Sequence, residues 1–113
     1  MYAEVLTNEF IAMPPTIDFI IMALCADYQR RKEIICSGDS TYRIIMEYRF
    51  LNYRILNAAT EVAGRGNAET FINEIGAGTG YTSSLLWRMS ESSYKRQKQA
   101  IKCNIAKHLC LYE

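Results

Sequence analysis

Apolar residues recur at helical spacing along most of this chain, and no stretch sustains the two-residue alternation of a β-strand. The spacing predicts helices over residues 17–35, 41–63, 68–75, 81–89 and 91–109. Before them, residues 1–15 look like a loosely held N-terminal arm, because Pro14 and Pro15 remove backbone donors and fix φ. At 113 residues the chain is large enough for a single core. We therefore expect one all-α domain over residues 16–113, a small bundle of about five helices.

Short polar residues stand where these helices are expected to begin. Their side chains can accept a hydrogen bond from the unpaired N–H groups of a first turn. They are Thr16, Ser40 or Thr41, Asn67 and Ser90. Phe71, Ile72 and Ile75 are expected to point inward from the short helix 68–75.

The last third of the chain predicts two helices joined by a tight serine turn. Leu85, Leu86 and Met89 share one face of the expected helix 81–89. In the following helix, Tyr94 and Ile101 belong to an apolar stripe that can dock on the rest of the domain. The opposite side and its flanks are polar and basic. This pattern predicts a C-terminal helix-turn-helix at about residues 80–109.

Positive charge is concentrated in the same region. Residues 88–113 hold 6 basic and 2 acidic residues, a net charge of +4, against −2 for residues 1–64 and −1 for residues 65–87. A basic helix face of this kind is typical of a nucleic-acid footprint. The alternative is that lysines gather near the end of a C-terminal helix because they complement its dipole.

The region resembles the helix-turn-helix in the fourth conserved region of bacterial sigma factors, and the small phage late-gene regulators built on it. The matching residues are Leu85, Met89-Ser90-Glu91-Ser92-Ser93-Tyr94-Lys95-Arg96, Ala100-Ile101 and Ile105-Ala106. The sequence departs from the pattern where two glycines precede the first helix. The resemblance implies a DNA-binding transcription regulator of phage or mobile-element origin.

The polar and basic residues of this region are the candidate DNA contacts. Basal affinity would come from cations on phosphates, namely Arg88, Lys95, Lys102 and Lys107. Bases would be read by Ser92, Arg96 and Gln99, because Arg suits guanine and Gln suits adenine. Lys102 and Arg96 are both expected to be exposed.

Arginines and tyrosines alternate in the longest predicted helix and suggest a second function. The set is Tyr42, Arg43, Tyr48, Arg49, Tyr53 and Arg54. It would suit a small phage or mobile-element protein that inhibits a host or defence protein by contact alone. The alternative is a set of amphipathic side chains lying along a helix surface. Exposed Tyr48 and Tyr53 would favour the protein partner, whereas exposed Arg96 and Gln99 would favour DNA.

Cys103 and Cys110 are seven residues apart, so they are expected on one face of the last helix. That face is either covered by the N-terminal helices or forms the seam of a homodimer.

The run Glu74-Ile75-Gly76-Ala77-Gly78-Thr79-Gly80 resembles the glycine-rich first motif of methyltransferases that use S-adenosylmethionine. In that family a buried strand precedes the glycines, and an acidic residue binds the ribose roughly twenty residues later. Here the preceding residues read as a helix, and the later position falls in the basic stretch 94–99. We therefore expect an interhelical loop and no cofactor.

No set of residues predicts catalysis or metal binding. His108 is the only histidine and is expected to pack on the apolar stripe of the last helix. The four cysteines lack the close spacing of a zinc site. No signal peptide is visible, and the apolar run of residues 17–26 is too short to span a bilayer. We therefore expect a cytoplasmic protein, not an enzyme, with reduced cysteines and neither a membrane nor a small-molecule partner.

Overall fold

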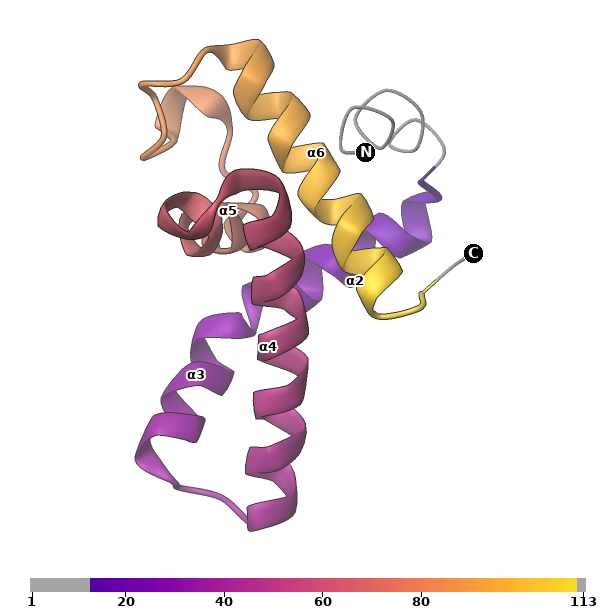
Figure 1. Cartoon of the computed structure of the whole chain (residues 1–113), viewed down its shortest axis with the longest axis vertical. Helices are drawn as coiled ribbons and strands as arrows, with labels where there is room; N and C mark the ends of the chain where they lie inside the picture. Colours follow the sequence, from indigo (N-terminus) through magenta and orange to yellow (C-terminus); the bar gives the residue numbers. More distant parts are fainter. Residues whose placement is uncertain (1–12, 112–113) are drawn as a thin grey trace.

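The computed structural model describes residues 13–111, and helices account for most of them (Figure 1). In chain order the elements are α2 (Pro15–Ala26), α3 (Tyr28–Ser37), α4 (Tyr42–Ala63), α5 (Arg65–Ala77), a short 3-10 helix η2 (Tyr81–Ser83) and α6 (Glu91–His108). No strand occurs in this part of the chain, so the all-α prediction is confirmed. Most of the predicted N-terminal arm, residues 1–12, lies outside the described residues.

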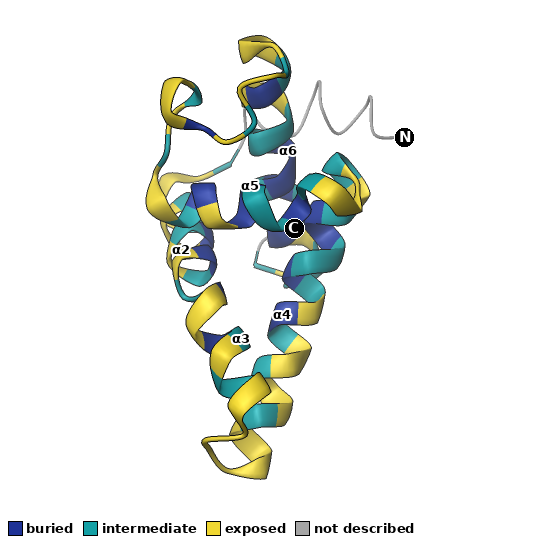
Figure 2. Ribbon diagram, turned by 90° about the vertical axis from the view of Figure 1, so that its left-hand side faces the viewer, coloured by how far each residue is buried: buried dark blue, intermediate teal, exposed yellow. Residues whose placement is uncertain are grey.

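The helices form a body with a projecting hairpin. α3 and the first half of α4 run side by side and extend away from the rest, so the molecule measures 42 × 32 × 24 Å (Figure 1). The second half of α4 packs against α5 and α6, while α2 packs against α5. Residues at the hairpin tip are almost all exposed, as Figure 2 shows. The segment 78–90 and the start of α6 lie at the opposite end of the molecule (Figure 1).

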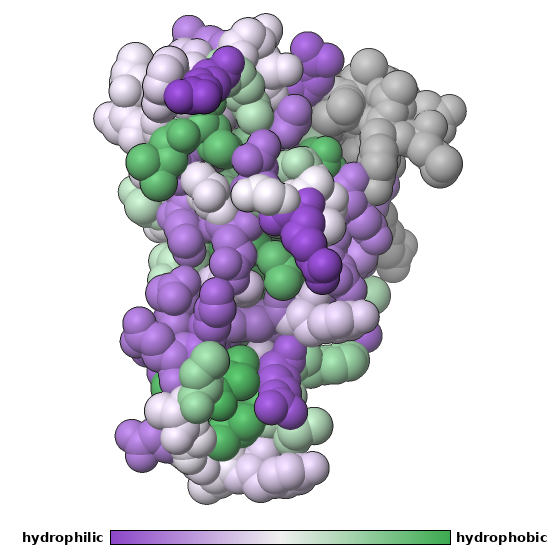
Figure 3. All heavy atoms as spheres, turned by 60° about the vertical axis from the view of Figure 1, so that its left-hand side comes forward, coloured by the Kyte–Doolittle hydropathy of each residue, from purple (hydrophilic) through white to green (hydrophobic). Residues whose placement is uncertain are grey.

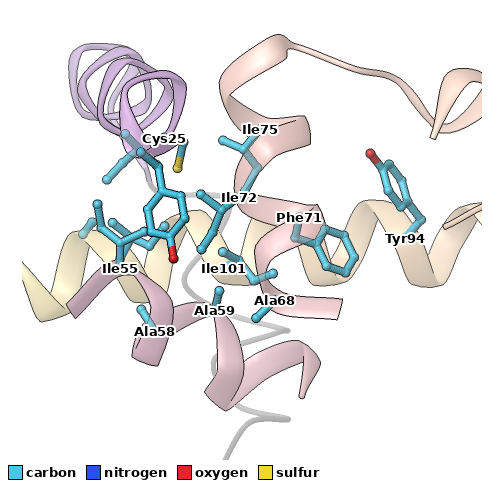
Figure 4. Packing of buried hydrophobic residues seen from close by; sticks show 14 residues of the cluster. Cys25, Ile55, Ala58, Ala59, Ala68, Phe71, Ile72, Ile75, Tyr94 and Ile101 are labelled. Carbon is cyan, nitrogen blue, oxygen red and sulfur yellow. The ribbon is translucent and has the colours of Figure 1, made fainter. Parts of the chain in front are cut away.

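The core lies where α2, α4, α5 and α6 meet (Figure 4). Large side chains such as Phe71 and Ile101 fill it, and small ones such as Ala59 and Ala68 allow the helices to approach closely. Phe71, Ile72 and Ile75 point inward as predicted. Burying this many apolar side chains supplies most of the favourable free energy of folding.

The helix predicted over residues 17–35 is divided at Asp27, which ends α2 and begins α3. The buried guanidinium of Arg31 stabilises the break. Its Nη2 donates to the carbonyl of Leu24 at 2.7 Å, and its Nε donates to Oδ1 of Asn52 in α4 at 2.7 Å. The amide of Asn52 in turn donates to the carbonyl of Tyr28 at 3.2 Å. Side chains therefore satisfy the carbonyls around the break.

Two of the predicted helix caps are confirmed and two are wrong. Thr41 and Ser90 each accept from the backbone N–H three residues later, at 3.3 and 3.2 Å. Thr16 lies inside α2, because the helix already begins at Pro15, which needs no donor there. Asn67 lies inside α5, because Gly64 turns the chain with a φ of 83° and α5 starts at the next residue.

The helix predicted over residues 81–89 is wrong, and the predicted helix-turn-helix at 80–109 therefore lacks its first helix. Only η2 and a series of turns occupy this stretch. The buried carboxylate of Glu74 accepts from Oγ of Ser84 at 2.7 Å and from the backbone N–H of Leu85 at 2.8 Å. These bonds fix Ser84 in extended backbone, with a ψ of 147°. A local helical pattern is overridden by a tertiary hydrogen bond.

The first part of the glycine-rich run belongs to the end of α5, and only residues 78–80 lie in the predicted interhelical loop. Glu74 to Ala77 form the last turn of α5, and Gly78 ends it in the left-handed region at φ 70°. Gly76 faces the backbone of α2, where a Cβ atom would lie 2.5 Å from the nitrogen of Ala26. These two glycines therefore serve helix packing and helix termination, and no strand precedes them.

Candidate nucleic-acid interface

The first two turns of α6 are exposed along one side and anchored along the other. Ser92, Lys95 and Arg96 are exposed, whereas Tyr94 between them is buried. Ser90 caps the helix, and Glu91 lies in its first turn, where a negative charge suits the helix dipole. Further along, Ala100, Ile101 and the residues after them are mostly buried against α4 and the rest of the core. Only the start of α6 presents an open face.

Tyr94 is the anchor of this end of the helix. Its ring stacks on Phe71 of α5 with centroids 5.4 Å apart (Figure 4), and its hydroxyl donates to Oε1 of Glu74 at 2.8 Å. Burial, together with that hydrogen bond, raises the pKa of Tyr94 to about 12. The hydroxyl therefore remains protonated at neutral pH and continues to donate to the carboxylate.

Lys98 binds inward rather than toward solvent. Its Nζ donates to the carbonyl of Thr79 at 2.6 Å and lies 5.6 Å from the centroid of the Tyr94 ring. Burial lowers the pKa of this amine. Lys98 thus connects α6 to the segment that precedes it.

The interhelical loop, residues 78–90, is held by hydrogen bonds along its length. In addition to the bonds from Glu74, the hydroxyl of Tyr81 donates to the carbonyls of Trp87 and Met89 at 3.0 and 2.7 Å. The loop nevertheless exposes large apolar side chains, because Leu85 is 79% and Trp87 62% exposed. The guanidinium of Arg88 lies 5.2 Å from the centroid of the Trp87 ring. A constrained loop thus presents an aromatic ring and a cation to solvent.

Four of the seven predicted DNA contacts come together at this end of the molecule, namely Arg88, Ser92, Lys95 and Arg96. Lys95 shares its charge with Glu91, since their side chains are 2.8 Å apart. Gln99 is half-buried, and Lys107 is exposed but belongs to the last turn of α6. Figure 3 shows apolar side chains over the loop end and again over the α3–α4 end, with mostly hydrophilic side chains and a smaller apolar group between them.

The prediction that Lys102 is exposed is wrong. Its side chain is only 15% exposed, and its Nζ donates to Oδ1 of Asp18 in α2 at 3.0 Å. Because α2 packs across this part of α6, an ammonium at position 102 meets a carboxylate before it reaches solvent. The residue therefore joins two helices and contributes no open positive charge.

Asn67 and Trp87 lie at this surface, but the sequence pattern did not predict either of them as a DNA contact. A shallow hollow between the start of α5 and the loop is lined by Asn67, Leu85, Leu86, Arg88 and Met89. One feature of the sequence could have indicated an exposed contact residue here. The sole tryptophan is followed directly by an arginine, in a segment that two glycines mark as a loop.

The Arg–Tyr set of α4 is divided between two faces. Tyr48 is half-buried beneath Arg30 of α3, whose Nη2 donates to its hydroxyl at 3.2 Å. Tyr42 and Tyr53 are 80% and 63% exposed. Exposure of these side chains therefore does not distinguish a protein partner from DNA. One residue of each predicted pair is exposed, namely Tyr53 and Arg96, while the other, Tyr48 or Gln99, is half-buried.

The helix face predicted for Cys103 and Cys110 does not form, whereas His108 packs in part against α4. His108 is half-buried at the edge of the core, with Nε2 3.0 Å from Oε1 of Glu61. Cys103 is buried inside the bundle. Cys110 lies beyond the end of α6 with a φ of 55°, so the two cysteines do not share a helix face.

Between residues 13 and 111, no cluster of three or more histidine, cysteine, aspartate or glutamate side chains is placed to hold a metal ion. In the same part of the chain, no helix has both the length and the apolar character needed to cross a membrane. No family model, curated protein or solved structure matches the sequence or its fold.

Proposed function

We propose that this protein binds duplex DNA with the loop 78–90 and the first two turns of α6, and that it acts as a transcription regulator rather than an enzyme. One observation carries the proposal. The open face of α6 holds Ser92, Lys95 and Arg96, while Tyr94 on the opposite side fixes the helix to the core. Although the chain lacks the first helix of a helix-turn-helix, residues near the start of a helix that enters the major groove are the ones that reach base edges.

The exposed residues divide into two roles. Arg88 and Lys95 lie at the edges of the surface and contact phosphates, which supply affinity without regard to sequence. Ser92 and Arg96 lie on the outward side of the helix and contact base edges, where arginine prefers guanine. Lys102 has no part in this surface, because Asp18 neutralises it.

The loop adds a contact that the helix alone does not provide. Trp87 is exposed three residues before the Ser90 cap, and Arg88 stands over its ring. We expect the indole to pack against the sugar–phosphate edge next to the groove that receives α6. Since the loop is already constrained, ordering it on binding costs little conformational entropy.

A salt titration tests the proposal. Mixed-sequence fluorescent duplexes of about three helical turns should bind more weakly as salt rises from about 50 to 200 mM, with a slope of about −0.9 per phosphate contact. Lys95→Ala should reduce that slope by about one unit. The matched control Arg43→Ala removes another exposed cation, which is paired with a glutamate four residues away as Lys95 is, and should leave the slope unchanged.

The single tryptophan provides a second, independent readout. If the loop contacts DNA, Trp87 emission should change in step with the anisotropy of the labelled duplex. Arg96→Ala should weaken binding to a preferred site by roughly 1–3 kcal/mol and binding to mixed sequence by less. An anisotropy signal that is insensitive to salt, or no binding at about 50 mM salt, would overturn the proposal.

A further inference from the structure

The outer face of the first half of α4 is apolar and uncovered. Its exposed side chains are Tyr42 (80%), Met46 (41%), Phe50 (59%) and Tyr53 (63%). Their positions follow one another by four, four and three residues, so they form a single stripe along the helix. At 1.5 Å per residue the stripe is about 17 Å long. We call these four residues the α4 stripe.

Neighbouring helices leave this stripe open. α3 packs on the other side of α4, where Arg30 reaches the Tyr48 hydroxyl and Arg31 binds Asn52. α6 is hydrogen-bonded to α4 beyond the stripe, where the carbonyl of His108 accepts from Nη1 of Arg54 at 2.8 Å. A shallow hollow lined by Met46, Arg49, Phe50 and Tyr53 lies on the stripe itself. Three of its four lining side chains are apolar or aromatic.

The charges beside the stripe indicate what kind of molecule fits. Residues 42–54 hold three arginines and one glutamate. Arg43 pairs with Glu47 at 3.2 Å, and Arg54 lies 4.5 Å from the centroid of the Phe50 ring. Arg49 is exposed at the edge of the hollow. The border of the stripe is therefore positive, which opposes a second copy of the same face and attracts a negatively charged partner.

We propose that the α4 stripe binds an amphipathic helix of another protein, with apolar residues at i, i+3 or i+4, and i+7, and with acidic residues beside them. An apolar stripe with polar borders is the surface that such a helix recognises. Exposed aromatic residues next to arginines are also the side chains that most often dominate binding energy at protein interfaces. This inference does not rest on DNA binding by α6, because the two surfaces share no residue.

A display library of random sequences about 18 residues long on a helical template tests the proposal. The library is selected on the wild-type protein alone, so that neither acidity nor weak binding to a variant is imposed on it. The selected sequences should be acidic and amphipathic, and their binding should weaken with salt. A synthetic peptide from this set should bind Phe50→Glu and Tyr53→Glu at least about 30-fold more weakly, the loss expected at a hot-spot residue.

Phe19→Glu is the matched control, because Phe19 is 76% exposed on α2 and lies outside the stripe. It should bind the peptide as the wild type does, and all three variants should keep the circular dichroism and melting temperature of the wild type. Selected peptides that are not acidic, or that bind Phe50→Glu equally well, would overturn the proposal.

Two further outcomes assign the stripe to a different occupant and equally overturn the proposal. One is a wild-type dimer in sedimentation that Phe50→Glu, but not Phe19→Glu, converts to a monomer. The other is that Phe50→Glu loses duplex binding while the wild type and Phe19→Glu keep it, which would mean that the stripe contacts DNA. The peptide assay contains no DNA, so its result and that of the salt titration are independent.

Discussion

Gly76 is the residue at which α5 and α2 come closest. A Cβ atom there would lie 2.5 Å from the nitrogen and 2.6 Å from the Cα atom of Ala26, and both are backbone atoms that cannot rotate away. We expect Gly76→Ala to lower the free energy of unfolding by about 1–3 kcal/mol, the usual cost of overpacking. Urea denaturation measures this loss.

Gly66→Ala is the control for this prediction, because Gly66 lies in the same helix and a Cβ atom there meets nothing within 4 Å. It should stabilise the protein by up to about 1 kcal/mol, since alanine favours a helix more than glycine does. Equal effects of the two substitutions would show that the close approach of α5 to α2 does not determine stability.

Arg31 and Arg30 bind the same carboxylate but differ in burial. Arg31 is 2% exposed and also binds Asn52 and the Leu24 carbonyl, so Arg31→Leu leaves buried acceptors without a donor. The expected loss is about 3 kcal/mol. Arg30 is exposed, and solvent screens its pair with Asp27, so Arg30→Leu should leave the urea midpoint nearly unchanged. The prediction fails if the two midpoints shift alike.

At the scale of elements, one carboxylate shapes the loop 78–90. Glu74 accepts from Ser84, Leu85 and Tyr94, and it is 6% exposed. Glu74→Ala should release the loop while α6 remains helical. The amide of Leu85 should then exchange its hydrogen at least about tenfold faster, because a lost hydrogen bond of this kind is worth about 1–3 kcal/mol.

Glu33→Ala is the control for the loop, since Glu33 is exposed on α3 at the other end of the molecule. Hydrogen exchange by mass spectrometry should show no change in the loop for this variant. Unchanged protection of residues 84–86 in Glu74→Ala would mean that other contacts, such as those of Tyr81, hold the loop by themselves.

At the scale of the whole molecule, paired carboxylates make stability depend on pH. Hydrogen bonds from Arg30, Asn104 and Lys32 hold the pKa values of Asp27, Glu61 and Glu69, respectively, below their usual values. Carboxyl groups with a lowered native pKa contribute stability that is complete above their unfolded pKa. That contribution is lost as the pH falls through the lower native pKa.

The urea midpoint should therefore be level above about pH 5 and fall progressively below about pH 4.5. Glu69→Gln removes one of these groups. The urea midpoint of this variant should be lower than that of the wild type near neutral pH, and it should decrease less as the pH falls. A midpoint that rises toward acid in the wild type would contradict the assignment.

Local periodicity in the sequence determined the class of the fold and most of its helices. The apolar spacing in 41–63 and 91–109 predicted α4 and α6 to within one or two residues, because each helix hides one face. The caps at Thr41 and Ser90 were also readable, since a capping hydroxyl binds an N–H only three residues away. Tyr94 was recognisable as a buried anchor from its stripe alone.

Contacts between residues far apart in the chain decided the rest. The division of the first helix depends on Asn52, 21 residues from Arg31. The loop in place of helix 81–89 depends on Glu74, and the withdrawal of Lys102 from the surface depends on Asp18, 84 residues away. A binding partner so far away in the chain does not alter the local apolar spacing around the residue that it binds, so that spacing cannot predict the contact. The sequence alone therefore determined most of the segments that form helices, because their apolar spacing is local. Tertiary packing divided the first helix, replaced the helix predicted over residues 81–89 with a loop, and decided which cations remain exposed.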